Sequence, residues 1–177
     1  MRIALAFTFA VLLFLRPAAA SEGGYHDFDF EIGTWNIRVR ELARPLSGSQ
    51  RWLQPRGYVH VAQPIWGGHA ILAQLEVEGT PPRFLGSLIH LYDSAAHVWK
   101  IYWADSSDGT VDPPLRGGFR GGIGTFAGRQ RFAGKPVLVR VVYSRITPAS
   151  FHSEQAISSD GGKTWRTNLI QDFSRIK

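Results

Sequence analysis

Between Gly33 and Arg175 the sequence is a series of short alternating or apolar runs, each bounded by glycine, proline, aspartate or serine. Such runs are typical of β-strands, and almost nothing in this part of the chain repeats with the period of an amphipathic helix. We expect strands at 33–42, 57–63, 69–78, 83–92, 97–104, 118–126, 137–146, 150–158 and 165–175, with a further short run at 129–133. Nine or ten strands joined by short turns predict an all-β antiparallel meander, closed as a barrel or split as a sandwich.

Strand alternation also predicts which side chains face inward, because successive residues of a strand point to opposite faces. Trp99 and Trp103 share one face of their run, and Tyr143 shares a face with valines of its own run. The runs at 57–63 and 83–92 leave open which of their faces is the inner one. The expected interior is aromatic and aliphatic with a few polar groups, which is typical of a pocket for a mainly apolar ligand.

The first twenty residues have the three parts of a secretory signal peptide. A basic start at Arg2 precedes an apolar stretch over 3–15, and Ala18 and Ala20 form a cleavage site. The apolar stretch is too short for a permanent membrane span. We therefore expect a signal peptide at 1–20, one domain at 21–177 and a periplasmic or secreted protein with no stable membrane span after cleavage.

Composition excludes several classes of function. The chain has no cysteine, so disulfides, thiolate metal sites and a cysteine nucleophile are absent. The net charge of +6 falls to +4 once Arg2 and Arg16 leave with the signal peptide, and the remaining charges are scattered. Because nucleic-acid binding needs a clustered basic patch, we expect no nucleic-acid partner.

The two ends of the mature chain resemble the lipocalin-like, or calycin, barrels. The first strand opens with Gly33-Thr34-Trp35, and the last ends with Asp172-Phe173-Ser174-Arg175. In those barrels a tryptophan of the first strand closes one end beneath a basic side chain from the last strand. The resemblance implies these barrel-closing roles for Trp35 and Arg175, where an indole face and a guanidinium would stack.

The wider pattern is similar to an uncharacterised bacterial family of small lipocalin-like domains, many of them exported. It includes the N-terminal stretch 26–35, Gly122–Phe126 with Gly134-Lys135-Pro136, Glu154-Gln155-Ala156 and the segment 159–175. The resemblance implies a barrel of about ten strands with a short N-terminal segment, and no activity tied to particular residues. Ser153 and Leu169 stand where tryptophan is expected in many relatives, which would enlarge or reshape the pocket.

Two glycine-rich segments have structural interpretations. The run from Arg116 to Phe126 predicts a strand bent by glycines, because no helix follows to complete a phosphate-binding loop. The segment from Ser158 to Trp165 fits the Asp-box pattern, in which an aspartate accepts backbone hydrogen bonds within a turn. One copy is too few for a β-propeller, so we expect a hairpin turn here.

The histidines and carboxylates do not form a recognisable metal or catalytic motif. None of the six histidines has the spacing of a metal-binding pair, and we expect no metal and no cofactor. His60 or His90 would serve as a haem ligand if its strand faced inward, an alternative that stays open. Glu31, Glu41 and Asp105 lie near expected strand ends, but no motif in the sequence pairs any of them with another functional residue.

We expect an exported barrel that binds a small, mainly apolar molecule. The ligand-binding candidates are Trp99, Trp103, Tyr143, Arg145, Gln155 and His90. The aromatic residues supply walls, while Arg145 and Gln155 supply a polar contact suited to a carboxylate. Two alternatives stay open: a small barrel enzyme of isomerase, cyclase or hydrolase type, with His60, His90 or Tyr143 transferring protons, and an envelope interaction module with a filled barrel.

Overall fold

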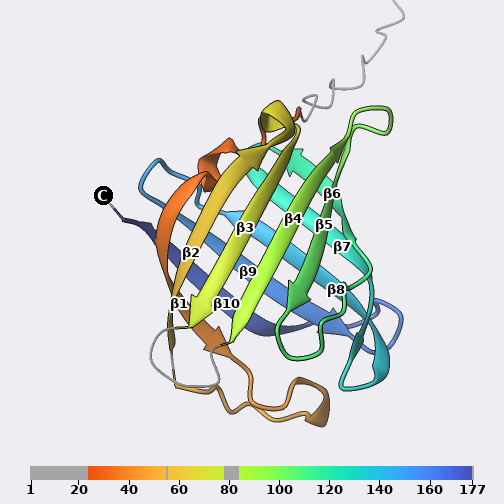
Figure 1. Cartoon of the computed structure of the whole chain (residues 1–177). Helices are drawn as coiled ribbons and strands as arrows, with labels where there is room; N and C mark the ends of the chain where they lie inside the picture. Colours follow the sequence, from red (N-terminus) through yellow and green to blue (C-terminus); the bar gives the residue numbers. More distant parts are fainter. Residues whose placement is uncertain (1–23, 55, 78–83, 177) are drawn as a thin grey trace, which may run out of the picture.

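The computed structural model describes residues 24–54, 56–77 and 84–176, and the signal peptide predicted at 1–20 lies outside them. Ten antiparallel strands form a closed barrel in which each strand pairs with its neighbours in sequence and β1 pairs with β10 (Figure 1). The strands are β1 (Gly33–Glu41), β2 (Arg56–Ile65), β3 (Ala70–Val77), β4 (Leu85–Asp93), β5 (Val98–Asp105), β6 (Leu115–Arg120), β7 (Ile123–Phe132), β8 (Lys135–Ser144), β9 (Ser150–Ser158) and β10 (Arg166–Arg175). The prediction of an all-β, lipocalin-like barrel is confirmed.

The division into strands differs from the prediction in the glycine-rich segment. The expected single bent strand at 118–126 is wrong, because Gly121 and Gly122 have φ values of 59° and 76° and turn the chain back on itself. The segment is a hairpin of β6 and β7, and β7 continues to Phe132 through the short run expected at 129–133. Glycine tolerates positive φ without strain, which explains why the turn falls at this pair.

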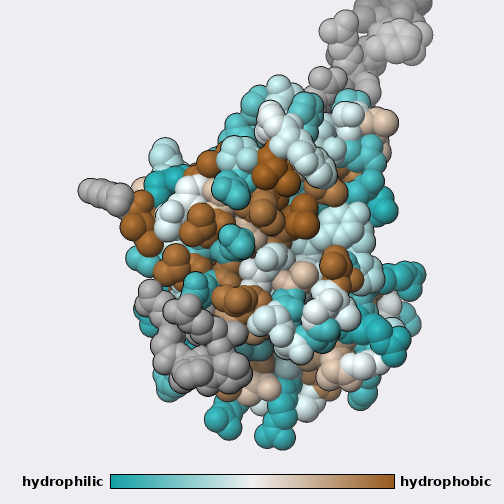
Figure 2. Space-filling view, viewed as in Figure 1, coloured by the Kyte–Doolittle hydropathy of each residue, from teal (hydrophilic) through white to brown (hydrophobic). Residues whose placement is uncertain are grey.

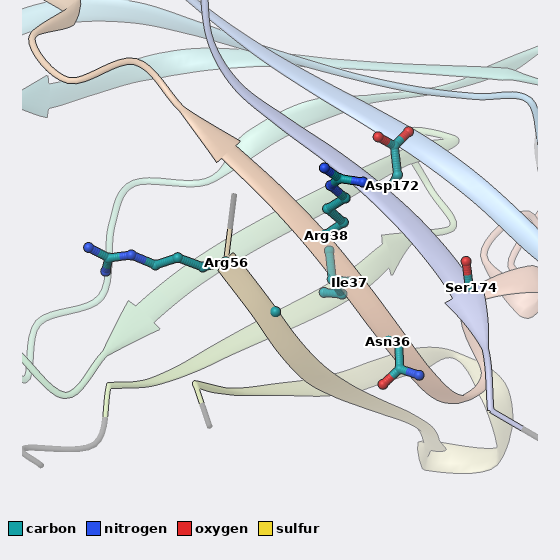
Figure 3. Close-up of a pocket in the computed structure, with 7 residues that line it drawn as sticks. Asn36, Ile37, Arg38, Arg56, Asp172 and Ser174 are labelled. Atoms are coloured by element: carbon teal, nitrogen blue, oxygen red, sulfur yellow. The ribbon is translucent and has the colours of Figure 1, made fainter. Parts of the chain in front are cut away.

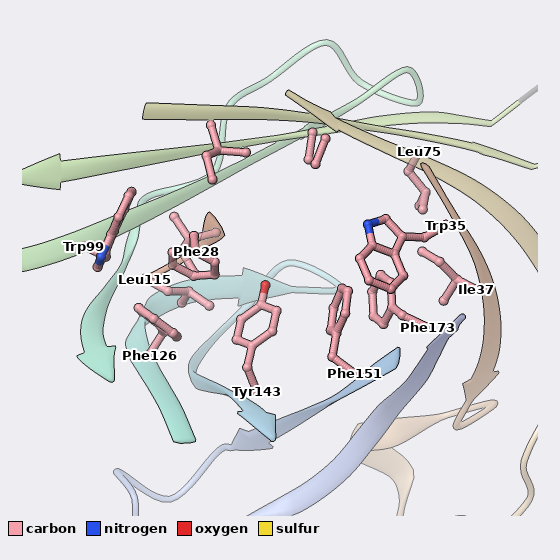
Figure 4. Packing of buried hydrophobic residues seen from close by; sticks show 14 of the residues in the cluster. Phe28, Trp35, Ile37, Leu75, Trp99, Leu115, Phe126, Tyr143, Phe151 and Phe173 are labelled. Carbon is pink, nitrogen blue, oxygen red and sulfur yellow. The ribbon is translucent and has the colours of Figure 1, made fainter. Parts of the chain in front are cut away.

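The chain before β1 enters one end of the barrel. It forms a 3-10 helix, η1 (Asp29–Glu31), and buries Phe28 completely. Phe28 makes edge contacts with Trp99, Phe119 and Tyr143, at ring-centroid distances of 5.0, 4.9 and 5.4 Å. Figure 4 shows Phe28 between Trp99 and Tyr143. The N-terminal segment is therefore part of the core, and it fills this end of the barrel.

The same end is sealed by the stack expected between the first and last strands. The Arg175 guanidinium lies 4.0 Å from the ring centroid of Trp35. It also donates hydrogen bonds to the carbonyl oxygens of Phe30 and Ile32, at 3.0 and 2.8 Å, and Trp35 Nε1 donates to the Glu31 carbonyl at 2.7 Å. One cation thus ties β10 to β1 and to the N-terminal segment.

The expected parity of the strands is seen in their burial. Trp35, Ile37 and Val39 of β1 are buried, as are Val139 and Tyr143 of β8. The two ambiguous strands are resolved, because His60 of β2 and His90 of β4 are buried inside, whereas Val61 and Ile89 are exposed outside. Figure 2 shows apolar side chains on the outer face that includes these two residues. Two short 3-10 turns, η2 (Pro45–Ser47) and η3 (Trp66–Gly68), complete the described elements.

Candidate functional site

A cavity of about 440 Å³ lies inside the barrel, between the N-terminal segment and the opposite end. Its walls come from inward-facing residues of most strands, and they are mainly aliphatic and aromatic. The apolar lining residues are Ile37, Val39, Tyr58, Leu75, Phe84, Leu88, Ile101, Trp103, Leu115, Phe132, Val139, Val141, Tyr143, Leu169 and Phe173. A volume in this range and a largely apolar lining are usual for the site of a small molecule.

At its deep end the cavity meets a buried group of two histidines and a glutamate. Glu31 Oε1 lies 3.0 Å from His60 Nε2, and Glu31 Oε2 lies 3.2 Å from His90 Nδ1. All three side chains are at most 1 % exposed. Glu31 and His60 line the cavity, while His90 lies behind them against the ring of Phe28, at a centroid distance of 4.3 Å.

The electrostatics of this group follow from its pairing. Burial by itself raises the pKa of the Glu31 carboxyl, but the charge of His90 and the hydrogen bonding of both imidazoles outweigh burial and lower that pKa to about 2. Glu31 is therefore a carboxylate at neutral pH. A buried charge is tolerated only with such partners, so the two histidines are what permit a carboxylate here.

Tyr143 adds a neutral polar group to the same end. Burial, followed by the negative charge of Glu31, raises the pKa of the Tyr143 hydroxyl well above its ordinary value. The phenol therefore stays protonated and can donate a hydrogen bond. Among the described residues its hydroxyl has no hydrogen-bond partner, which leaves it free to serve a ligand in the cavity that it lines.

The opposite end of the cavity is the mouth. Phe84 and Trp103 stack there with their ring centroids 6.3 Å apart, and Trp103 Nε1 donates to Asp105 Oδ2 at 3.0 Å. Glu41, Asp112, Gln130 and Arg131 complete this end of the lining. The mouth thus combines aromatic faces with several charged side chains.

Three of the six predicted ligand-binding residues line the cavity: Trp103, Tyr143 and Gln155. Trp99 and His90 are buried deeper, where the N-terminal segment occupies the space that a ligand would otherwise reach. Trp99 contacts that segment directly, because its Nε1 donates to the Gly24 carbonyl at 3.2 Å. Arg145 is exposed and does not line the cavity, which corrects its expected place inside the pocket. β8 ends at Ser144, and Arg145 adopts a φ of 52° in an exposed turn, so strand alternation stops before it.

Sequence reasoning did not find the pairing of Glu31 with His60 and His90. The three residues belong to η1, β2 and β4, and they meet only because the N-terminal segment enters the barrel. One signal was available: Glu31 lies directly between Phe30 and Ile32, where an acidic residue that becomes buried with its neighbours needs a partner. Within the described part of the chain, no group of three or more histidine or acidic side chains could hold a metal ion.

A second hollow lies on the outer surface, over β1, β2 and β10 (Figure 3). It has a volume of about 530 Å³ and includes Arg38, Arg56 and Asp172. Beside it, Asp172 Oδ1 lies 2.6 Å from Nδ1 of His152, whose Nε2 lies 3.0 Å from Glu154 Oε1. Carboxylates thus contact both nitrogens of this histidine. Most residues that line the hollow are polar or charged, and it lies on the outer surface of the barrel.

The turn between β9 and β10 has the hydrogen bonds of an Asp-box. Asp160 accepts from the Ser158 hydroxyl at 2.7 Å and from the Thr164 backbone amide at 2.9 Å. Hydrogen bonds from Thr164, first that of its side chain, lower the pKa of the Asp160 carboxyl to about 2. The interpretation as a structural hairpin turn is confirmed.

In the part of the chain that the structure describes, no helix is long and apolar enough to cross a membrane. Searches with family models and among curated proteins find no match to this sequence. Among solved structures, the S-type phycobiliprotein lyase CPES from Guillardia theta is similar in fold, with a TM-score of 0.52 and 13 % sequence identity. The likeness covers 85 % of this chain and 90 % of the lyase chain, so it extends over the barrel as a whole.

Proposed function

We propose that this protein is an exported member of a bacterial family of lipocalin-like domains and that it binds a small, mainly apolar molecule inside its barrel. The observation that carries the proposal is the cavity of about 440 Å³, with apolar walls, a neutral phenol at its deep end and an aromatic pair at its mouth. The fold shared with a phycobiliprotein lyase supports the proposal. A barrel filled by its own side chains would leave no such space, which disfavours the interaction module.

The proposal is tested by binding of the neutral apolar dye N-phenyl-1-naphthylamine, whose fluorescence rises in apolar surroundings. We expect a saturable rise that dodecan-1-ol reverses by competition. Leu169 lines the cavity and Ile170, the next residue of β10, faces outward. Leu169→Trp should weaken dye binding by reducing the cavity volume, whereas Ile170→Trp should leave it unchanged. Equal binding by both variants would place the dye outside the barrel.

A second candidate function is proton transfer to and from the bound molecule. It is favoured by His60, which lines the cavity while Glu31 contacts its Nε2. A carboxylate that orients a histidine is a common arrangement for a general base. An isomerisation would remove a proton from one carbon of the ligand and return it to another, with no cofactor consumed and with Tyr143 donating a hydrogen bond to the ligand carbonyl.

This second function predicts isotope exchange. An apolar ketone that binds in the cavity, incubated with the protein in D₂O, should gain deuterium beside its carbonyl group faster than the free ketone. Mass spectrometry measures the gain. His60→Asn should remove the acceleration while the ketone still displaces the dye. Unchanged exchange in this variant would contradict the proton-transfer function and leave binding as the one supported function.

A further inference from the structure

The charged side chains of the cavity are distributed unevenly. Three carboxylates line it near the mouth: Glu41 at the end of β1, Asp105 at the end of β5, and Asp112 in the loop that follows. Among the described lining residues the lone arginine or lysine is Arg131, whose Nη2 donates to the Gly134 carbonyl at 2.7 Å. Over the described lining residues, the mouth is therefore acidic on balance.

The acidic side chains lie beside aromatic faces. Trp103 donates to Asp105 and stacks with Phe84, so an indole, a phenyl ring and a carboxylate occupy one side of the mouth. Aromatic faces attract cations through their quadrupoles, and a nearby carboxylate adds to that attraction. Burial, followed by the charges of Asp108 and Asp105, raises the pKa of the Asp112 carboxyl. This direction is consistent with an excess of negative charge near the mouth.

The deep end supplies an independent reason to expect an occupant. Tyr143 is 5 % exposed and lines the cavity, and among the described residues its hydroxyl has no hydrogen-bond partner. Figure 4 shows this hydroxyl pointing into the barrel interior. Beside it, Glu31 is held as a carboxylate by contacts with two imidazoles, so a second anion would meet a like charge there. An apolar body or a neutral acceptor fits this end, whereas a carboxylate does not.

We propose that the barrel selects cationic amphiphiles: molecules with an apolar body inside the cavity and an amine or quaternary ammonium group at the mouth, against Trp103, Phe84, Asp105 and Asp112. This inference rests on the proposed function and adds the charge of the ligand to it. It also reverses the preference for carboxylates that Arg145 suggested, because Arg145 lies outside the barrel.

Three probes with the same chain test the charge preference: dodecyltrimethylammonium, dodecan-1-ol and dodecanoate, each below its micelle concentration at pH 7.5. Displacement of N-phenyl-1-naphthylamine measures their affinities. We expect the cation to bind at least tenfold more tightly than the carboxylate, with the alcohol between them. Raising the salt concentration from 0.05 to 0.5 M should narrow this difference, because charges at an open mouth are screened.

Substitutions of single carboxylates show which residues cause the preference for a cationic ligand. Asp112→Asn should lower the ratio of cation affinity to alcohol affinity at least threefold, and Asp105→Asn should do the same if its turn still folds. Asp29→Asn, which removes a carboxylate from the closed end of the barrel, should leave the ratio unchanged. Carboxylate affinity equal to or above that of the cation overturns this inference while alcohol binding sustains the proposed function. Failure of all three probes to bind overturns both.

Discussion

At the scale of single residues, the group formed by Glu31, His60 and His90 is the most demanding feature of the barrel. Removing one partner of a buried ion pair leaves an uncompensated polar group, which typically costs about 3–5 kcal/mol. Exposed pairs typically contribute about 1 kcal/mol or less. The N-terminal segment offers both cases, because Asp29 forms an exposed contact with His26 at 2.8 Å.

We predict that Glu31→Gln lowers the free energy of unfolding by about 3 kcal/mol or more, whereas Asp29→Asn lowers it by at most about 1 kcal/mol. Urea denaturation followed by tryptophan fluorescence measures both. Similar losses in the two variants would mean that the buried group does not hold the N-terminal segment in the barrel.

The same group predicts a pH dependence of stability. The pKa of the Glu31 carboxyl is about 2 in the folded protein and near 4.5 without its partners. A lowered folded pKa means that its contribution is complete above pH 4.5 and is lost as the pH falls from 4.5 toward 2. The stability difference between the wild type and Glu31→Gln should therefore shrink over that window. A difference that stays constant from pH 6 to pH 3 would contradict this pairing.

At the scale of elements, the hairpin of β6 and β7 shows why some glycines are required. A Cβ on Gly117 would overlap the backbone carbonyl oxygen of Thr125, on the facing strand. A Cβ on Gly118, the next residue, would meet no atom within 4 Å. The close approach of two backbones, and not space for a ligand, therefore explains Gly117.

We predict that Gly117→Ala destabilises the protein by roughly 1–3 kcal/mol or more, because the strands must move apart. Gly118→Ala should change stability by about 0.5 kcal/mol or less, as is usual for substitutions without a steric conflict. Thermal unfolding followed by circular dichroism compares the two. Equal melting temperatures would mean that β6 and β7 accommodate the added methyl group without loss of stability.

The elements also show how much the sequence could predict. Alternation was sufficient for the inward faces of β1, β5 and β8, because one face of each is apolar and the other carries charge or amide groups. It failed at Arg145, because β8 ends at Ser144, two residues before the predicted boundary. It left β2 and β4 open because both of their faces are largely apolar. It missed the Glu31 group because no local pattern reports that residue 31 will meet residues 60 and 90.

At the scale of the whole molecule, the barrel is closed at one end and hollow toward the other. The N-terminal segment and the stack of Arg175 on Trp35 close one end, while the cavity extends from Glu31 to the charged mouth. The sequence predicted the closed end through its resemblance to lipocalin-like barrels. The charge of the mouth depends on side chains from three separate elements, which only the closed barrel brings together.

A ligand held in such a cavity must stabilise the whole fold, because it binds the folded chain and not the unfolded one. At a concentration of 100 times its dissociation constant, a single-site ligand adds about 2.7 kcal/mol. Dodecyltrimethylammonium below its micelle concentration should therefore raise the melting temperature of the wild type by several degrees. Leu169→Trp, with its smaller cavity, should show a smaller rise; an equal rise would indicate binding elsewhere.

Native mass spectrometry of the protein purified from its own host tests the central claim most directly. The account predicts a reproducible bound mass of roughly 150–600 Da, the size that such a cavity encloses, which is lost on denaturation and is less abundant in Leu169→Trp. A wild-type protein that carries no bound mass, and that binds none of the dye and amphiphile probes, would contradict it.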